Sequence, residues 1–423
     1  MLDLKVIWEE PAPYRAALAR RGSADALDRA LRLDERRRSL LTEIEGLRAD
    51  QRKYAKAIPR QPTSEDREEM IAASRVMSER INALEPDLIR VEDELADLMG
   101  RLPNVPDPSV PDGSSDEDNE VIRVVGDPPV LDFQPKDHGE LGERLGMIDI
   151  ERGVRTSGSR FYYLTGPAVR LEFALVQLGL DFAERHGLWP VWTPALARRE
   201  AMFGTGFLPT DEAQIYATRD DDLYLIGTAE VTLASYHAGE ILDPAELPKR
   251  YVGYSTCFRR EAGTYGKDTR GVFRVHQFDK LEMFSFVLPE DSLAEHDRLL
   301  AREEEFVQAL GLAYRVVNVC VGELGAPVAK KYDIEAWFPG QGRYREITST
   351  SNTTDYQARR LETRVRLADG TRPLHTLNGT LCALTRMIAC LIENGQQADG
   401  SVEMPEVLRP YLPEAHWVIR PPA

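Results

Sequence analysis

The residues best suited to chemistry lie between Cys257 and Phe284, in the string CFRREAGTYGKDTRGVFRVHQFDKLEMF. Two apolar stretches, which we expect to form strands, flank a polar loop whose basic side chains are those of Arg259, Arg260, Lys267 and Arg270. On the first strand Arg259 and Glu261 share parity, so they should face the same side. On the returning strand one parity is shared by Arg274, Phe278, Lys280 and Glu282.

A sheet face of this composition suits a nucleotide. Arginine forks onto phosphate, a phenylalanine ring stacks on a base, and a carboxylate accepts hydrogen bonds from amino groups. A surface hairpin with scattered salt bridges explains the same composition, so these residues alone leave both interpretations open. The string from Gly263 to Lys267 lacks the spacing of a GxxxxGK[ST] loop, and Gly204-Thr205-Gly206 lacks the setting of a dinucleotide loop. Side chains must therefore hold any nucleotide.

The first 103 residues predict a helical hairpin. Apolar residues recur in alternating steps of four and three, as in a heptad seam, in two stretches. The first seam is Leu40, Ile44, Leu47, Gln51, Tyr54 and Ile58, and the second is Met77, Ile81, Leu84, Leu88, Val91, Leu95 and Leu98. Between them, IPRQPTSEDREE holds two prolines and a Thr/Ser cap followed by acids, which ends one helix and begins the next. Pro86 should kink the second helix or mark a discontinuity.

The two predicted helices differ in charge. Residues 20–60 hold 12 arginines and lysines against 7 acids, whereas residues 61–101 hold 5 against 11. The basic cluster on the first helix is Arg36, Arg37, Arg38, Arg48, Arg52, Lys53 and Lys56. Charge alone leaves two interpretations open, a solvated coiled-coil flank and a surface that contacts phosphates.

The rest of the chain predicts a second domain. Residues 104–120, rich in Pro, Asp and Ser, have the composition of a linker with no core of its own. From residue 121 to 423, short strands such as DLYLIG and KRYVGYSTCF mix irregularly with helices such as VRLEFALVQLGLDFAERHG. That order favours an α+β fold on an antiparallel sheet. The predicted domains are thus 1–103, a linker at 104–120, and 121–423.

Composition narrows the class of protein. A 42% hydrophobic and 29% charged chain of 423 residues is typical of a globular protein, and no apolar run is long enough for a membrane helix. The net charge of −17 argues against an indiscriminate nucleic-acid binder such as a DNA-coating protein. Four cysteines without CxxC spacing predict buried thiols in a reducing cytoplasm, with neither a disulfide frame nor a zinc site.

Several long strings resemble one family in its own order. Residues 258–284 resemble the second signature of class II aminoacyl-tRNA synthetases in the form typical of the seryl enzymes, and residues 377–412 resemble the third. HGLWPVWTPALARRE is similar to the first signature, a helix and strand at a dimer interface, while LIGTAEV, REITSTSNTTDYQARR and GTGFLP are similar to further seryl-enzyme segments. The N-terminal hairpin resembles the family's tRNA-binding arm. The resemblance implies a class II catalytic domain and a homodimer.

The resemblance also implies an ATP site with Mg²⁺. Arg259 would bridge the α-phosphate and the serine carboxylate, Glu261 would accept from the adenine amino group, and Phe278 would stack under the adenine. Arg386 would cover its other face near the γ-phosphate, and Val275 would offer backbone groups. Glu346 and Ser349 would hold the magnesium ion. The implied catalytic residues are Arg259, Glu346 and Arg386, and the remaining ATP-binding residues are Arg260, Ile347 and Thr348.

Serine recognition falls, by the same resemblance, to Thr228, Ala229, Glu230, Arg259, Glu282, Asn378 and Thr380. Glu282 and Thr380 would pair the substrate hydroxyl, while Glu230 and Thr228 would hold its ammonium group. Taken alone, Asn378 and Thr380 predict a cap for a helix that opens at Leu381. Lone histidines such as His138 and His276 are more often structural than catalytic.

The implied partners are serine, ATP and serine tRNA, with Arg36, Arg37, Arg48, Arg52, Lys53 and Lys56 on the arm, and neither a membrane nor DNA. The implied activity is that of a serine–tRNA ligase. Two alternatives stay open: a paralogue of the family serving antibiotic resistance or a biosynthetic pathway, and a non-catalytic RNA-binding coiled-coil scaffold. Loss of Arg259, Glu282 or Arg386 would indicate the scaffold, and all three are present.

Overall fold

The computed structural model describes residues 1–263 and 271–422. It contains two compact units, one formed by Leu2–Pro103 and the other by Asn104 onward together with Met1. The predicted polar loop between the two strands of the nucleotide-binding candidate falls partly outside the described residues, and so do Lys267 and Arg270.

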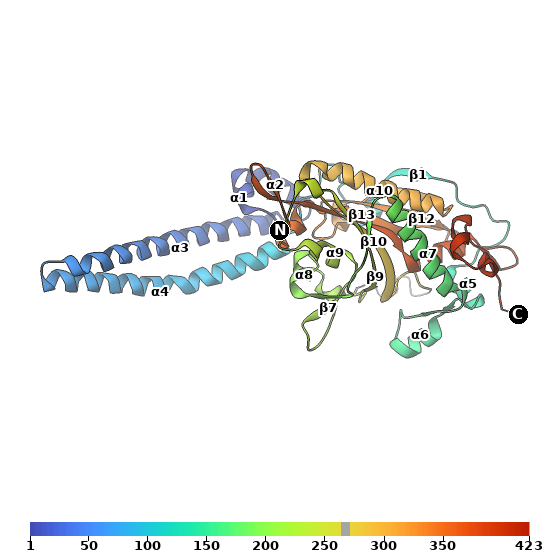
Figure 1. Ribbon diagram of the computed structural model, residues 1–423, viewed down its shortest axis with the longest axis horizontal. Helices are drawn as coiled ribbons and strands as arrows, with labels where there is room; N and C mark the ends of the chain where they lie inside the picture. The colour runs from blue at the N-terminus through green and yellow to red at the C-terminus, as the bar shows by residue number, and fades with distance from the viewer. Residues whose placement is uncertain (264–270, 423) are drawn as a thin grey trace. The chain divides into compact units, whose positions relative to one another are not determined.

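The N-terminal unit is a long antiparallel helical hairpin on a small helical base (Figure 1). Its helices are α1 (Leu4–Glu9), α2 (Pro11–Ala19), α3 (Ala24–Ala57) and α4 (Ser64–Arg101), with the 3-10 turn η1 (Ile58–Arg60) at the tip. The side chain of Thr63 accepts a hydrogen bond from the Asp66 backbone at 3.1 Å and caps α4, as the sequence predicted. The buried seam residues are Leu40, Ile44, Ile81, Leu84 and Val91.

Pro86 does not interrupt its helix. The structure has α4 as one helix of 38 residues that contains Pro86, so the predicted discontinuity is wrong. Proline removes one backbone donor from a helix interior. Here Leu84 and Val91 on either side stay buried against α3, and this packing holds the helix together across the missing bond.

Asp34 organises the base of the hairpin. Its carboxylate is only 3% exposed and accepts from Trp8 Nε1 at 2.7 Å and from Arg37 Nη2 at 2.7 Å. Arg38 approaches the same carboxylate at 3.2 Å and lies 4.2 Å from the Trp8 ring centroid. A buried carboxylate needs such compensation. Two of the predicted phosphate-binding arginines are therefore engaged inside their own unit.

The second unit is built on an eight-stranded sheet with the order β1-β11-β12-β13-β16-β10-β9-β4. The strands are β1 (Glu120–Val125), β4 (Trp189–Trp192), β9 (Lys249–Phe258), β10 (Gln277–Val287), β11 (Tyr314–Asn318), β12 (Lys330–Phe338), β13 (Arg343–Asn352) and β16 (His375–Ala383). Every neighbouring pair is antiparallel except β4 with β9. The predicted α+β fold on an antiparallel sheet is confirmed.

Two long helices back one face of this sheet. They are α7 (Pro167–Arg185) and α10 (Ser292–Ala309), with α12 (Leu384–Asn394) following β16 directly (Figure 1). A Cβ on Gly179 of α7 would lie 2.3 Å from Leu281 of β10, which shows how closely this helix approaches the strand. The opposite face of the strands is left to the shorter elements and to the cavity described below.

Shorter elements complete the unit. The helices are α5 (His138–Arg144), α6 (Ile150–Ser157), α8 (Arg199–Gly204), α9 (Glu230–Ala234) and α11 (Tyr356–Arg360). The strands are β2 (Ile148–Asp149), β3 (Tyr163–Leu164), β5 (Leu196–Arg198), β6 (Tyr216–Ala217), β7 (Leu223–Leu225), β8 (Ile241–Leu242), β14 (Arg364–Leu367), β15 (Gly370–Pro373), β17 (Val402–Glu403) and β18 (Val418–Ile419).

The segment expected as a linker is packed against the second unit. Asn104 donates from its side-chain amide to the carbonyls of Pro327 at 2.9 Å and Thr353 at 2.8 Å. Val110 is 2% exposed and joins an apolar cluster with Val319 and Val321. Composition missed this because many of the contacts use backbone groups, such as the Asp107 N–H, which donates to the Ala329 carbonyl at 2.9 Å. The segment's backbone is therefore part of the folded unit.

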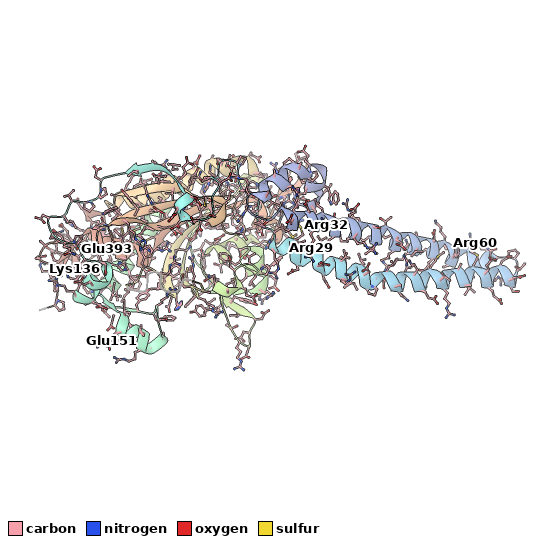
Figure 2. All side chains as sticks on the ribbon, turned by 180° about the vertical axis from the view of Figure 1, so that it is seen from behind. Arg29, Arg32, Arg60, Lys136, Glu151 and Glu393 are labelled. Atoms are coloured by element: carbon pink, nitrogen blue, oxygen red, sulfur yellow. The ribbon has the colours of Figure 1, made fainter. Side chains whose placement is uncertain are left out.

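Glu393 ties α12 to the first residue of α5, His138, and to the loop at Gly340 and Gln341. It is fully buried and accepts from the His138 ring at 2.8 Å, from the Gly340 backbone at 2.9 Å and from Gln341 at 3.0 Å. Figure 2 labels it beside Lys136. His138 is thus a structural residue.

Candidate active site

A cavity of about 360 Å³ lies over the strands β10, β13 and β16, and most of the predicted substrate-binding residues line it. These are Thr228, Glu230, Arg259, Glu261, Val275, Phe278, Glu282, Glu346, Ile347, Thr348, Ser349, Asn378, Thr380 and Arg386. They come from the segments that follow β9 and precede β10, from β10, β13 and β16, and from the beginnings of α9 and α12. Segments 158 residues apart in the chain thus meet in one space.

Two predicted residues are absent from the lining. Ala229 is fully buried in an apolar cluster with Leu233 and Phe284 and does not line the cavity. Arg260 is exposed, and its backbone N–H donates to the Gln214 carbonyl at 2.9 Å. The side chains of neighbouring Arg259 and Arg260 therefore have different surroundings.

The parity argument holds for only part of the predicted set. Strand β9 ends at Phe258 and β10 begins at Gln277, so Arg259, Glu261 and Arg274 lie outside the strands. Glu261 has a φ of 50°, a left-handed conformation rare for residues with a side chain. The cavity still receives all three, because tertiary contacts direct them there.

Gln214 holds the segment that carries Glu261. Its side-chain amide donates to the Ala262 carbonyl at 3.0 Å and accepts from the Ala262 backbone N–H at 3.0 Å. The Glu261 carboxylate in turn accepts from Arg274 at 2.7 Å. These bonds compensate the cost of the left-handed residue and fix the direction of its carboxylate. Sequence reasoning missed Gln214, since nothing in the sequence indicates which backbone its amide will meet.

A bulge in β13 aligns two predicted metal ligands. The ladder with β12 skips Ile347, so Glu346 and Ser349 fall on the same face although their spacing would separate them on a regular strand. Thr348 then points to the other face, where its hydroxyl donates to Glu303 of α10 at 2.9 Å. Burial raises the pKa of Glu303 well above its usual value. The side chain of Thr348 is therefore engaged behind the sheet.

A second bulge shapes the other end of the cavity. Thr380 pairs with Glu282 across β16 and β10, and the ladder skips Leu381. Asn378 and Thr380 thus belong to β16, whereas α12 begins at Leu384. The predicted helix cap at these residues is wrong, because the chain stays extended through Ala383 to complete the sheet.

Arg259 is held in place from two sides. Its Nε donates to the Gly227 carbonyl at 3.1 Å, and its guanidinium lies 5.3 Å from the Phe278 ring centroid. Its backbone is paired with His276, whose N–H-bearing Nδ1 lies 2.8 Å from the Arg259 carbonyl. An arginine fixed in this way presents its remaining N–H groups to an anion without further ordering.

Arg386 and Glu346 form the other charged corner. Arg386 Nη1 lies 2.9 Å from a Glu346 carboxylate oxygen, and its guanidinium lies 5.1 Å from the Phe273 ring centroid. Burial opposes ionisation of Glu346, but the charges of Arg386 and Lys331 outweigh it and hold the pKa of this carboxyl well below its usual value. Glu346 is therefore an anion before any ligand arrives.

The pKa of Glu230 is shifted in the opposite direction to that of Glu346. Burial, reinforced by the negative charge of Glu282, raises the pKa of Glu230 to about 7. One carboxylate oxygen accepts from Gln357 Nε2 at 2.7 Å. A buried carboxyl that titrates near neutrality gains its charge most readily when a cation binds beside it.

The cavity also contains residues to which the sequence assigned no role. Lys331 and Ser351 share the cavity face of the central strands, and Phe207 and Phe273 supply rings. Lys280, noted only for its parity, is 5% exposed. The alternating spacing Lys331, Asp333, Glu335 in β12 was the available signal for a charged strand face.

The basic cluster of the hairpin is largely paired. Arg36 contacts Asp87 at 2.9 Å and Arg48 contacts Glu85 at 2.7 Å, each across from α3 to α4, while Lys53 contacts Asp50 at 2.8 Å. Along the described residues of the chain, Arg52 and Lys56 have no carboxylate within ion-pair distance. Figure 2 labels Arg29, Arg32 and Arg60 along the same helix and its tip.

Comparison with known proteins agrees with both units. Residues 1–106 match the seryl-tRNA synthetase N-terminal domain, and residues 214–395 match the tRNA synthetase class II core domain shared by the G, H, P, S and T enzymes. A serine–tRNA ligase of Acidothermus cellulolyticus is 50% identical over 413 residues, which cover 97% of this chain and 98% of that protein. The chain belongs to the seryl-tRNA synthetase family. A serine–tRNA ligase of Streptomyces coelicolor is also 50% identical, over 97% of each chain.

Solved structures of seryl-tRNA synthetases agree with the fold. The enzyme of Pyrococcus horikoshii, crystallised with ATP, superposes with a TM-score of 0.94 at 42% identity over the whole of both chains. The cytoplasmic enzyme of Naegleria fowleri, crystallised with AMP, gives 0.84 at 35% identity over 95% of this chain and 94% of that one. The class II fold predicted from the sequence is confirmed.

Proposed function

We propose that this chain is a serine–tRNA ligase, which activates serine with ATP and transfers the seryl group to the 3′ end of serine tRNA. The observation that carries the proposal is the pairing of opposite chemistries in one cavity. Arg259 and Arg386 suit the anionic phosphates, while Glu230 and Glu282 suit the ammonium and hydroxyl groups of an amino acid. Family membership supplies the identity of the amino acid and of the tRNA.

In the first step, the serine carboxylate attacks the α-phosphorus of ATP and pyrophosphate leaves. Arg259 bridges the two reacting anions, since its free N–H groups fork between a carboxylate and a phosphate. Phe278 stacks under the adenine, with Arg386 on the far side and near the γ-phosphate. Glu261 accepts from the adenine amino group, and Val275 offers backbone groups to the adenine edge. The chain contributes position and charge rather than a covalent intermediate.

In the second step, the terminal adenosine hydroxyl of tRNA attacks the acyl carbon and AMP leaves. Glu230 and Glu282 keep the amino acid in place during both steps. Both carboxylates are at least nine-tenths buried, so a substrate without matching groups leaves them unpaired. This mismatch disfavours alanine.

Magnesium belongs to the proposal as a partner of ATP. Glu346 and Ser349 offer a carboxylate and a hydroxyl on one strand face, and Mg²⁺ commonly uses one or two carboxylates together with substrate phosphates. These residues fit the ion in type. When bound, it would neutralise phosphate charge. Among the described residues, no three His, Cys, Asp or Glu side chains gather into a metal site made of protein alone.

The hairpin is proposed as the tRNA-binding arm. Arg52 and Lys56 suit phosphate contacts, and Arg36, Arg37, Arg48 and Lys53 would first exchange a carboxylate partner for a phosphate. A shape-based contact with double-stranded RNA suits a helical hairpin of this kind.

A homodimer is also proposed. Trp189 and Trp192 lie on β4, the edge strand of the large sheet, and are 72% and 83% exposed. Such apolar exposure on a strand edge is typical of an interface. Within the described residues, no helix has both the length and the apolar composition needed to cross a membrane. We propose the cytoplasm as the compartment because its tRNA substrate acts there in translation.

The test is ATP–pyrophosphate exchange with serine, threonine, alanine and cysteine, each with and without tRNA. Exchange that depends on serine, followed by charging of serine tRNA, is the expected result. Exchange without charging would indicate a paralogue with another acceptor. If no amino acid supports exchange, the remaining interpretation is the non-catalytic RNA-binding scaffold.

A further inference from the structure

Lys280 is a buried lysine in the amino-acid end of the cavity. It is 5% exposed and lies on β10, two residues before Glu282. Its Nζ donates to Thr228 Oγ1 at 2.8 Å and makes an ion pair with Glu282 Oε2. An ammonium group has only donors, so every group that contacts it must act as an acceptor toward it.

This contact decides what Thr228 can offer a ligand. Thr228 Oγ1 accepts from Lys280 Nζ at 2.8 Å and from the Glu230 backbone N–H at 3.2 Å. A hydroxyl oxygen has two acceptor positions and one proton to donate. Both acceptor positions are occupied, so Thr228 has only its proton to offer. An ammonium group cannot use that proton, whereas an oxygen atom can.

Lys280 also divides the two oxygens of Glu282. Oε2 pairs with Lys280 and accepts from Thr380 Oγ1 at 3.3 Å. Oε1 is left as the acceptor for a ligand. In Glu230 the corresponding division is made by Gln357, which bonds Oε1 at 2.7 Å and leaves Oε2. Each carboxylate therefore presents one oxygen to the cavity.

We propose that Lys280 is a positioning residue for the selection of serine, because it makes Thr228 a donor and reserves Glu282 Oε1 as an acceptor. A substrate hydroxyl satisfies both at once, donating to Glu282 and accepting from Thr228. Thr228 Oγ1 and Glu282 Oε2 contact the same ammonium nitrogen, so these two side chains meet at one point in the lining of the cavity. The inference rests on the proposed function and deepens it.

This assignment changes the role of Thr228. The family resemblance places Thr228 with Glu230 at the ammonium end of serine. The hydrogen bonds place it at the hydroxyl end, and leave the ammonium to Glu230 Oε2. Alanine would then leave both Thr228 and Glu282 without a partner in a buried pocket, which is the arrangement that gives strong rejection of a substrate lacking a hydroxyl.

The first experiment replaces Thr228, with Lys280 left intact. Exchange kinetics are measured with serine and with alanine for Thr228→Val and Thr228→Ser. Thr228→Val should lower kcat/KM for serine about 10- to 100-fold and leave that for alanine within about threefold, because one buried partner of the hydroxyl is lost. Thr228→Ser should keep the discrimination. An equal loss for serine and alanine would mean that Thr228 holds the ammonium, and would overturn the proposal.

The second experiment replaces the lysine. Lys280→Met should raise the KM for serine about 10- to 100-fold and reduce the serine-to-alanine preference, while the KM for ATP stays within about twofold. Lys249→Met, on the neighbouring strand β9 outside the cavity, is the matched control and should change none of these. In the Thr228→Val background, Lys280→Met should change the KM for serine and the serine-to-alanine preference much less than it does in the wild type.

Additive effects of the two substitutions, or an unchanged preference in an enzyme that still exchanges, would overturn the role of Lys280. Should Lys280→Met fail to fold, the variants Thr228→Val and Thr228→Ser still decide whether Thr228 donates a hydrogen bond to the substrate hydroxyl. Failure of the proposed function looks different, since the wild type itself would then show no serine-dependent exchange.

Discussion

The two arginine-rich regions of this chain use the same residue type in different ways. In the cavity, Arg259 is bonded to a backbone carbonyl and Arg386 to a carboxylate that is ionised before any ligand binds. On the hairpin, the side chains of Arg36 and Arg48 are 53% and 51% exposed and pair with acids of the facing helix. Exposed ion pairs of this kind contribute about 0 to 1 kcal/mol.

This difference suggests what each region is built for. The cavity holds its cations in fixed directions, which suits a reaction whose transition state carries charge at defined points. The hairpin holds its cations weakly, so they can leave a carboxylate for a phosphate at little cost. The number of arginines in a segment therefore says less about its function than the contacts that each guanidinium makes.

The largest expected effect tests the fixed cation. Arg259→Ala should reduce serine-dependent exchange about 1,000-fold, since a preorganised charge beside the reacting anions is removed. Arg260→Ala is the matched control, because that side chain is exposed and outside the cavity lining. Retention of normal tRNA affinity in both variants would show that the N-terminal unit is intact.

Comparable losses of serine-dependent exchange in Arg259→Ala and Arg260→Ala would contradict the distinction between fixed and weakly held cations. They would mean that both arginines act on the substrate, and that fixed orientation does not separate a functional cation from its neighbour. Exchange should be measured at saturating ATP and serine, so that the loss reports the chemical step rather than binding.

A smaller effect is expected on the hairpin. The double variant Arg52→Ala/Lys56→Ala should raise the KM for tRNA about 5- to 30-fold, corresponding to about 1 to 2 kcal/mol, and flatten its salt dependence, since two phosphate-binding candidates are lost. Serine-dependent exchange without tRNA should stay unchanged. The matched control is Arg36→Ala/Arg48→Ala, whose side chains are already paired and should matter less.

An equal or larger effect of the control pair would show that the paired arginines are the ones that meet tRNA. The distinction between free and paired cations on the hairpin would then be wrong. A change in tRNA-independent exchange for either pair would contradict the separation of the two regions altogether.

Sequence reasoning succeeded where local patterns decide the structure. The heptad spacing of residues such as Leu40 and Ile81 predicted the hairpin, because its seam is set by neighbours three and four residues away. The apolar run from Lys249 to Phe258 coincides with β9. The resemblance named most of the residues that line the cavity.

Sequence reasoning failed where contacts between residues far apart in the chain determine the local structure. The bulge at Ile347, which brings Ser349 to the face of Glu346, and the bulge at Leu381 depend on the partner strand rather than on the local sequence. The amide of Gln214 acts on a backbone 48 residues away. The charge state of Glu230 depends on burial by the whole fold. Spacing along the chain contains none of these facts.

The smallest expected effect concerns pH and separates the amino-acid end of the cavity from its ATP end. The pKa of Glu230 in the empty cavity is about 7, raised by burial and by Glu282, and a substrate ammonium group needs the ionised carboxylate. Below pH 7 the carboxyl must lose a proton before serine binds, so the KM for serine should rise about tenfold between pH 8 and pH 6. Glu230→Gln should bind serine weakly at every pH and remove this slope. The KM for ATP should change little over the same range, since Glu346 is held as an anion by Arg386 and Lys331. A parallel rise in both KM values would instead indicate general loss of structure in acid, and would remove the link between the pH dependence and the amino-acid end of the cavity.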